Sequence, residues 1–189
     1  MLNRESLDAF VFINFKQAIG FGHVAWGFAL DAERYFFGST DHLLRTPMWH
    51  LPALLSYSRV APGGDVDFWC GQGSLNEMLE IMSSGPHIRY HSYKRLSVSN
   101  ANPEQARDYA FKLRERGWCI VDNNCVHQTA RLLQVFGVNP DVLNAGSILP
   151  VDKSLRVPVQ WFGALEAEEV VLRKIQTSSR AIAVSVREK

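Results

Sequence analysis

Three runs of aromatic and β-branched residues at the start of the chain constrain its fold more than any other feature of the sequence. They cover residues 9–15, 22–29 and 34–39. Only residues 30–33 separate the second run from the third, and this spacing is typical of a β-hairpin. The sequence therefore predicts a β-hairpin near the N-terminus, preceded by another segment with the composition of a strand.

Helical patterns follow in the middle of the chain. Asn102 as an N-cap and Pro103 at the first helical position predict a helix that stops at Gly117, with apolar residues recurring every three to four positions. A second amphipathic helix is predicted to end at Gly137. Cys125 lies in the first turn of this second helix, and this position makes its thiol a candidate for chemistry.

Shorter patterns predict further elements. Ser74 and Glu77 form a capping-box pattern that begins a short helix, and residues 87–98 read as a strand with one wetter face. The C-terminal part is expected to contain three more elements, namely a strand at residues 157–163, a helix at about residues 164–175 and a strand at residues 181–186.

The length of 189 residues favours one domain spanning residues 1–189, since domains average roughly 150 residues. Within it, residues 40–86 are expected to make a long excursion over the surface. Prolines and a glycine pair interrupt the first part of this region, which shows no sustained hydrophobic period: Pro47, Pro52, Pro62 and Gly63-Gly64.

The net charge limits which classes of partner are expected. Lys and Arg number 20 against 19 Asp and Glu, so the formal net charge is +1 and no overall field draws the protein to nucleic acid. The apolar run at residues 9–13 is too short for the core of a signal peptide, and no segment approaches the roughly 20 apolar residues needed to cross a bilayer. We therefore expect no nucleic-acid partner and no membrane span.

The cysteines indicate the redox compartment. Three cysteines without CxxC spacing, Cys70, Cys119 and Cys125, do not suggest a disulfide framework or a cysteine-built zinc site. His87 and His91, even taken with Cys70, match no strong zinc pattern. We expect reduced thiols, a cytoplasmic location with leaderless secretion left open, and neither metal nor cofactor.

Cys125 is the strongest candidate for a nucleophile. Asn123 or Asn124 is a good N-cap for the following helix, so the thiol lies where free backbone N–H groups and the helix dipole stabilise a thiolate. A free thiol with a pKa near 8.5 is only about 3% ionised at pH 7, whereas helix N-termini lower thiol pKa values substantially. The alternative is that Cys125 is a small buried residue that packs the start of the helix.

A nucleophilic cysteine needs a base, and His23 is the best placed of the six histidines. It lies at the start of a predicted strand between Gly22 and Gly27, where the backbone can approach a neighbouring element closely. His127 follows Cys125 by two positions, about 200° around the helix, so their side chains point apart. A strand imidazole meeting a helix-terminal thiol is the arrangement used by papain-like enzymes. The alternative is a structural histidine.

The segments HVAWGF at 23–28 and NNCVHQTARLL at 123–133 resemble the circularly permuted branch of the NlpC-type papain-like superfamily, which includes the lecithin:retinol acyltransferase-like proteins. In that branch the histidine strand precedes the cysteine helix, and the cysteine lies in an Asn-Cys-x-His motif matched here by residues 124–127. The resemblance implies an α+β, papain-like, circularly permuted fold in which a small antiparallel sheet packs against the helix that bears the nucleophile.

The resemblance also implies a third polar residue that orients His23. In the family this is commonly a histidine about twelve positions further on, which in this chain falls at Tyr35. Tyr35 is therefore the expected third catalytic residue, although a phenol stabilises imidazolium less well than a carboxylate does. Glu33, Asp41 and His42 are nearby substitutes. For the oxyanion, the backbone N–H of Cys125 is the expected donor, with the side chain of Asn124 or Asn123 as a further candidate.

These features predict a cysteine-dependent hydrolase that cleaves peptide or amide bonds, including those of cell-wall peptides, through a Cys125–His23 dyad and a thioester. One alternative is a thiol acyltransferase or lipid esterase. Another is a non-catalytic binding protein on the same scaffold, suggested by the missing histidine at position 35. The expected partner is a peptide or acyl substrate, and the sequence leaves the oligomeric state open.

Overall fold

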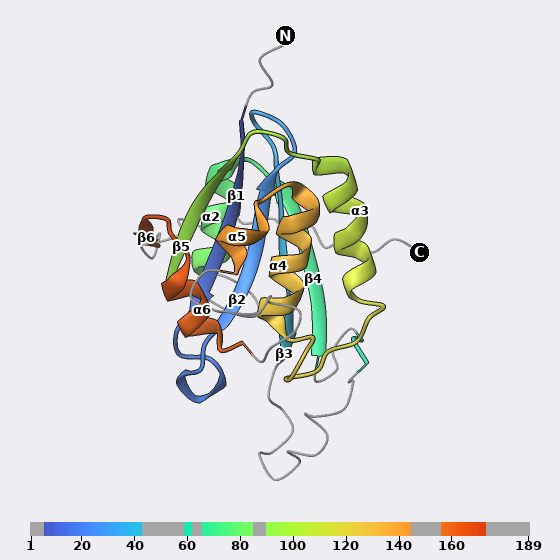
Figure 1. Ribbon diagram of the computed structural model, residues 1–189, viewed down its shortest axis with the longest axis vertical. Helices are drawn as coiled ribbons and strands as arrows, with labels where there is room; N and C mark the ends of the chain where they lie inside the picture. The colour runs from blue at the N-terminus through green and yellow to red at the C-terminus, as the bar shows by residue number, and fades with distance from the viewer. Residues whose placement is uncertain (1–5, 43–58, 62–65, 85–89, 145–155, 173–189) are drawn as a thin grey trace.

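Six strands form one antiparallel sheet in the computed structural model, which describes residues 6–42, 59–61, 66–84, 90–144 and 156–172 (Figure 1). The order across the sheet is β4-β3-β2-β1-β5-β6. The strands are β1 (Leu7–Asn14), β2 (His23–Ala29), β3 (Tyr35–His42), β4 (Val66–Gly73), β5 (Ser92–Val98) and β6 (Glu169–Val171).

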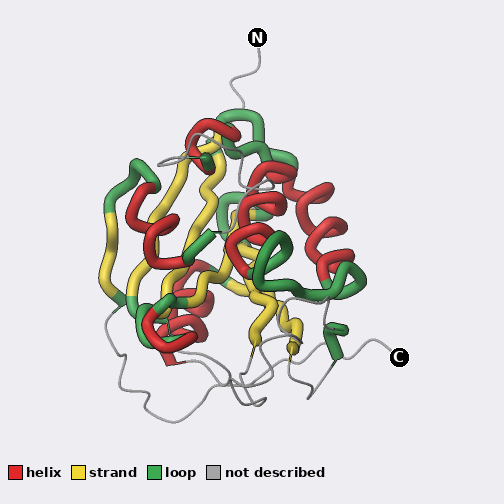
Figure 2. Tube along the Cα trace, turned by 60° about the horizontal axis from the view of Figure 1, so that its bottom comes forward, coloured by secondary structure: helices red, strands yellow, loops and turns green. Residues whose placement is uncertain are grey.

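Helices cover both faces of this sheet. They are the 3-10 helix η1 (Ala18–Gly20), α2 (Leu75–Ser84), α3 (Pro103–Leu113), α4 (Cys125–Phe136), α5 (Pro140–Leu143) and α6 (Pro158–Ala164). Residues of α3, α4, α5 and α6 join the hydrophobic cluster on one face, whereas α2 contributes to the cluster on the other. Figure 2 shows the strands lying between these helices. The fold is therefore α+β, as expected.

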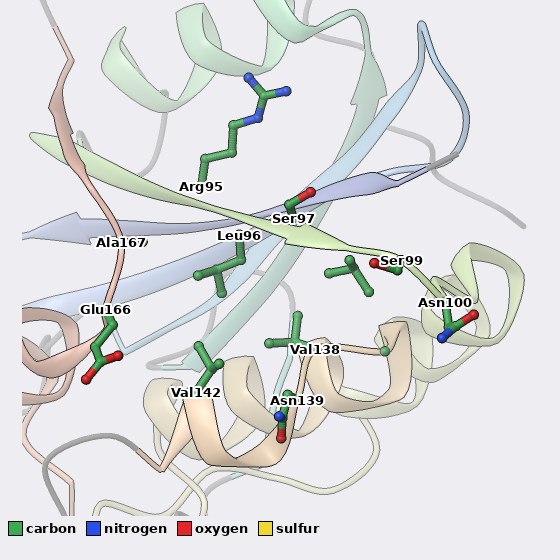
Figure 3. A pocket seen from close by; sticks show the side chains of 12 residues that line it. Arg95, Leu96, Ser97, Ser99, Asn100, Val138, Asn139, Val142, Glu166 and Ala167 are labelled. Carbon is green, nitrogen blue, oxygen red and sulfur yellow. The ribbon is translucent and has the colours of Figure 1, made fainter. Parts of the chain in front are cut away.

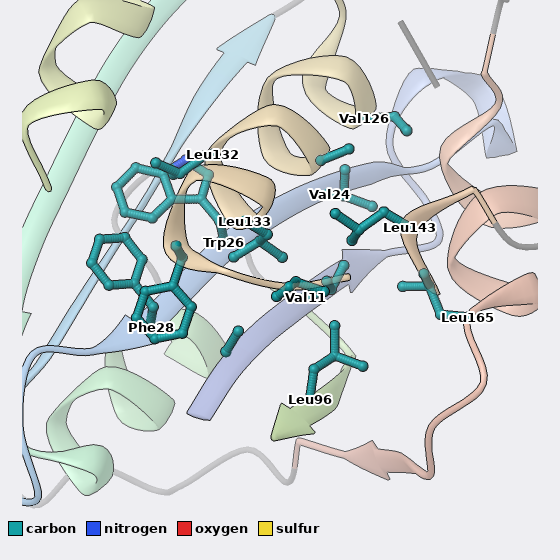
Figure 4. Close-up of a cluster of buried hydrophobic side chains, with 14 of the residues drawn as sticks. Val11, Val24, Trp26, Phe28, Leu96, Val126, Leu132, Leu133, Leu143 and Leu165 are labelled. Atoms are coloured by element: carbon teal, nitrogen blue, oxygen red, sulfur yellow. The ribbon is translucent and has the colours of Figure 1, made fainter. Parts of the chain in front are cut away.

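Strand β1 is covered on both faces, which explains why its sequence is a continuous apolar run. Val11 and Ile13 belong to the cluster under α4, while Phe10 and Phe12 belong to the cluster under α2. All four are 1% exposed or less. The cluster under α4 also contains Trp26 of β2, as Figure 4 shows. Burial of this many apolar side chains is the main force that holds the helices on the sheet.

Helix α4 begins and ends where the sequence predicted. Asn124 is its N-cap, and Gly137 ends it with a backbone φ of 118°, in the left-handed region that glycine adopts without strain. A Cβ on Gly137 would lie 2.7 Å from the carbonyl oxygen of Asn100. Asn102 and Pro103 also start α3 as predicted. These ends fix where residue 125 sits relative to the sheet.

Two predictions for the C-terminal part were wrong. Residues 157–163, expected as a strand, form α6, because Pro158 begins a helix whose Trp161 and Phe162 pack into the cluster under α4. In the segment expected to be a helix from about residue 164, Ala164 instead ends α6, Leu165 is extended, and Glu169–Val171 form the short edge strand β6. Residues 173–175 and the strand predicted at 181–186 lie outside the described residues.

The surface excursion expected at residues 40–86 was also partly wrong. Residues 66–73 form β4, which pairs with β3 along its whole length, and α2 follows at the capping box of Ser74 and Glu77. The remaining parts of this region, residues 43–58, 62–65 and 85–86, lie outside the described residues. No helix in the described part of the chain is both long and apolar enough to pass through a bilayer.

Candidate active site

His23 is the first residue of β2 and lies opposite Asp41 on β3. The two strands pair Trp26 with Gly38 and Ala29 with Tyr35, and the same register extended to the start of β2 sets position 41 across from position 23. His23 Nε2 lies 2.8 Å from Asp41 Oδ1. Asp41 is fully buried and His23 is 4% exposed, so this ion pair lies inside the protein.

The Asp41 carboxylate determines which nitrogen of the His23 ring faces Cys125. An ionised carboxylate only accepts hydrogen bonds, so Nε2 must donate, and Nδ1 is the nitrogen left to face Cys125. Ser39 Oγ also lies 2.8 Å from Nε2. Trp69 Nε1 donates to the second oxygen of Asp41 at 2.7 Å. The ring is thus oriented by a carboxylate that is itself held in place.

Cys125 is the first residue of α4 and is 5% exposed. The Asn124 side chain accepts hydrogen bonds from the backbone N–H groups of Val126 and His127. Within the described residues, the backbone N–H of Cys125 itself has no acceptor. A free N–H at the positive end of a helix, next to a thiol, is what an oxyanion intermediate requires.

The charges of this site act strongly on His23. Burial alone lowers the pKa of an imidazole, but the charge of Cys125 opposes it, together with the hydrogen bonds from Asp41 and Cys125 and the charge of Asp41. Together these groups raise the pKa of His23 to about 10. At neutral pH the ring is therefore an imidazolium, placed between the Cys125 thiol and the Asp41 carboxylate.

Tyr35 does not join this site. It is the first residue of β3, paired with Ala29, and so lies at the opposite end of the β2–β3 pair from His23. Its ring packs edge-on against Phe10, with centroids 5.7 Å apart, in the cluster under α2. Of the substitutes considered from the sequence, Glu33 is exposed in the turn beside Tyr35, and the side chain of His42 is outside the described set. Asp41 is the residue that reaches the ring.

The two asparagines before Cys125 use their side chains to hold the backbone. Asn124 Nδ2 donates to the carbonyls of Ile120 and Arg156, each at 3.0 Å, while its oxygen caps α4. Asn123 Nδ2 donates to the Gly117 carbonyl at 2.9 Å, and its oxygen accepts from Arg131. Neither amide is free to bind an oxyanion in this arrangement, so the Cys125 N–H is the donor that the geometry offers.

Residues 156–159 contact both the segment before Cys125 and the segment before His23. The Arg156 carbonyl accepts from Asn124, next to Cys125, and the Val159 N–H donates to the Phe21 carbonyl at 3.1 Å, two residues before His23. Between these contacts lies Gly22, with φ of 84°, where a Cβ would lie 2.6 Å from Val159 Cγ2. The sequence predicted a close approach of the backbone at Gly22, but it did not indicate that Val159 would be the neighbour.

Among the described residues, no three His, Cys, Asp or Glu side chains are grouped so that they could bind a metal ion. His91 accepts a hydrogen bond from the Phe15 backbone, and Cys70, whose pKa burial raises to about 11, lies on β4. A hollow of about 410 Å³ between β5 and the segment after α4 contains neither His23 nor Cys125 (Figure 3). Its lining includes no cysteine and no histidine, so His23 and Cys125 remain the candidate site.

Comparison with known proteins gives no relative for this chain: no family model, no curated protein and no solved structure matches it. The site must therefore be interpreted from its own geometry.

Proposed function

We propose that this protein is a cysteine-dependent hydrolase of amide bonds, built on the circularly permuted NlpC-type papain-like arrangement. The observation that carries the proposal is the position of His23 between the Cys125 thiol and the Asp41 carboxylate. The order of the two segments supports it, since the histidine strand β2 precedes the cysteine helix α4. A thiol, an imidazole and a carboxylate in series make a nucleophile, a proton carrier and a group that orients the carrier.

Acylation follows from the ionised pair. The Cys125 thiolate attacks the carbonyl carbon of the substrate, a C–S bond forms, and the electrons of the C=O π bond move to the oxygen. The Cys125 N–H donates to the resulting oxyanion. When the oxyanion collapses, the C–N bond breaks, and His23 gives its Nδ1 proton to the departing amine. The products are a free amine and a thioester on Cys125.

Deacylation reverses the proton movement. Neutral His23 takes a proton from water at Nδ1 as the water oxygen attacks the thioester carbonyl. Collapse of this second intermediate breaks the C–S bond, releases the carboxylic acid and returns the thiolate beside an imidazolium. Throughout both steps Asp41 keeps its own charge and holds the ring through Nε2, which leaves Nδ1 free for the chemistry.

Peptides, including cell-wall peptides, are the substrates we propose first, by analogy with the family that the two motifs resemble. The binding-only alternative was motivated by the absence of a histidine at position 35. Asp41 removes that motive, because a buried carboxylate orients and charges His23 more effectively than a phenol does. We therefore favour catalysis over binding alone.

The test is the pH dependence of iodoacetamide labelling, resolved by residue with mass spectrometry, in the native protein and in His23→Ala. An ordinary thiol is only about 1% ionised at pH 6.5, so loss of the imidazolium should slow labelling of Cys125 roughly 100-fold at that pH. Cys70 and Cys119 serve as internal controls whose rates should stay unchanged. Equal and slow labelling of all three thiols in the native protein would refute the dyad.

Turnover is tested next with peptide amides and their ester analogues. Cys125→Ala should abolish hydrolysis, and hydroxylamine should release an acyl group from the native enzyme when deacylation is slow. Hydrolysis that persists in Cys125→Ala would exclude the thiol as the nucleophile.

A further inference from the structure

Tyr90 is a completely buried residue at the site that the mechanism above does not use. It lies just before β5, and its backbone N–H donates to the Met82 carbonyl at the end of α2. Its ring lies beside that of His23, with centroids 6.1 Å apart and planes inclined by 34°. Tyr90 is 0% exposed, so whatever its hydroxyl does, it does inside the protein.

The Tyr90 hydroxyl has no hydrogen-bond partner among the described residues. Burial, followed by the negative charge of Asp41, raises the pKa of Tyr90 well above its ordinary value, so the phenol keeps its proton and can act as a donor. Buried polar groups in native proteins are almost always paired, and an exception next to a catalytic group calls for an explanation. The explanation must lie within reach of the hydroxyl.

Two acceptors lie beside this hydroxyl, Ser39 and Asp41. Ser39 Oγ is already 2.8 Å from His23 Nε2 and also lies 3.5 Å from the Val24 carbonyl. Each oxygen of Asp41 accepts one hydrogen bond, from His23 and Trp69, whereas a carboxylate has about four acceptor positions. Hydrogen bonds to a charged acceptor are also the stronger ones. Asp41 is therefore the better partner for the Tyr90 hydroxyl.

We propose that Tyr90 is a positioning residue whose hydroxyl donates to the Asp41 carboxylate and so sets how strongly that carboxylate holds the His23 ring proton. Asp41 then has a donor from each of three neighbours: the ring of His23 on β2, the indole of Trp69 on β4 and the phenol before β5. This role deepens the proposed function and rests on it, because it matters to catalysis only if His23 carries protons for Cys125.

The proposal makes a signed prediction for the titration of His23. A donor on Asp41 stabilises the carboxylate charge, which weakens its hold on the ring proton. Tyr90→Phe keeps the ring and removes the donor, so it should raise the pKa of His23 by roughly half a unit to one unit. The other groups that face this ring, Cys125 on α4 and Ser39 on β3, stay in place unless they are changed deliberately.

The measurement is an NMR titration of the histidine ring nitrogens in a Cys125→Ala background, where the charge of the thiolate cannot obscure the effect. The His23 signal is identified by its absence from a His23→Gln sample. Tyr35→Phe is the matched control, because it removes a buried phenol at the far end of the same strand pair and should leave His23 unchanged.

A rise in the His23 pKa in Tyr90→Phe alone, with a lower unfolding midpoint in urea, supports the proposal. An unchanged titration with equal or higher stability overturns it, because removal of a truly unpaired hydroxyl relieves a cost. A fall in the His23 pKa also overturns it, since loss of a donor on Asp41 can only strengthen the hold of the carboxylate on the ring proton. None of these outcomes depends on turnover, so they remain distinct from a failure of the labelling test.

Discussion

The two ends of the β2–β3 pair are equally buried but hold opposite kinds of side chains. At one end His23, Ser39 and Asp41 are all 4% exposed or less and are joined by hydrogen bonds. At the other end Tyr35 is 7% exposed and packs against Phe10 among apolar neighbours. Exposure to solvent therefore does not explain why the side chains at the first end are polar.

Burial of charge costs free energy that a packed apolar end does not. A hairpin that needed only stability could bury aromatic residues at both ends, as it does at the Tyr35 end. The retained ion pair between His23 and Asp41, set against the Cys125 thiol, is the feature that stability alone does not explain. The contrast between the two ends leads directly to experiments that change one end at a time.

The largest effect is expected from Asp41→Asn. Loss of the carboxylate removes the charge on His23 and permits the wrong ring tautomer, so hydrolysis should fall by roughly 10³–10⁴-fold. The pH profile should shift as well. In the native enzyme the rate should fall as pH rises through the pKa of His23, about 10, because the imidazolium that protonates the leaving group is lost. In Asp41→Asn this alkaline limb should move to lower pH.

Tyr35→Phe is the control at the other end of the same strands. It removes one hydroxyl from a packed aromatic cluster and should change neither the rate nor the alkaline limb. If Tyr35→Phe slowed hydrolysis as much as Asp41→Asn did, the distinction between the two ends would be wrong.

The sequence was informative where local rules decide the outcome. The capping residue Asn124 and the stop at Gly137 place Cys125 at a helix N-terminus, and the glycines around His23 mark a close approach. The partner of His23 was harder to find. Asp41 was considered as a loop residue because the aromatic run ends at residue 39, but pairing with β4 extends β3 to His42.

The register of β2 and β3 explains why Asp41 was not predicted as the partner of His23. In an antiparallel pair the residue opposite His23 is set by the length of the turn, and Ala29 paired with Tyr35 places position 41 across from it. The sequence indicated a separation of residues 30–33, whereas the strands leave residues 30–34 between them, and one residue more changes which position lies opposite His23. Tertiary packing decided the C-terminal part too, because Trp161 and Phe162 suit a strand by propensity but are buried by a short helix.

The polar end also depends on a contact from outside the hairpin, and Gly22→Ala tests it. Position 22 has φ of 84°, and a Cβ there would collide with Val159 of α6. We expect the free energy of unfolding to fall by about 2–4 kcal/mol. Labelling of Cys125 at pH 6.5 should slow by about tenfold, because residues 156–159 are displaced. Urea unfolding and site-resolved labelling measure the two effects.

Gly20→Ala separates backbone strain from this collision. Gly20 has a similar φ of 89°, but a Cβ there would meet nothing within 4 Å. It should cost only about 1 kcal/mol, from the left-handed backbone, and leave labelling unchanged. Equal losses in the two variants would mean that α6 does not hold the start of β2.

The smallest effect is expected from Asn124→Ser, which separates the capping of α4 from the hydrogen bonds that the Asn124 amide donates to Ile120 and Arg156. Serine can still accept the hydrogen bonds of the first turn, but it lacks the amide that donates to Ile120 and Arg156. We expect a loss of about 1 kcal/mol in stability and labelling of Cys125 that is slower by a factor of about three.

Asn102→Ser is the matched change at the N-cap of α3, where the amide bonds Gln105 of its own helix. A similar or smaller loss of stability is expected there, with no change in labelling. Because both variants keep a capping oxygen, a labelling defect confined to Asn124→Ser would arise from the position of Cys125 rather than from a weakened helix. Equal labelling in the two variants would instead show that the cap alone places the thiol against His23.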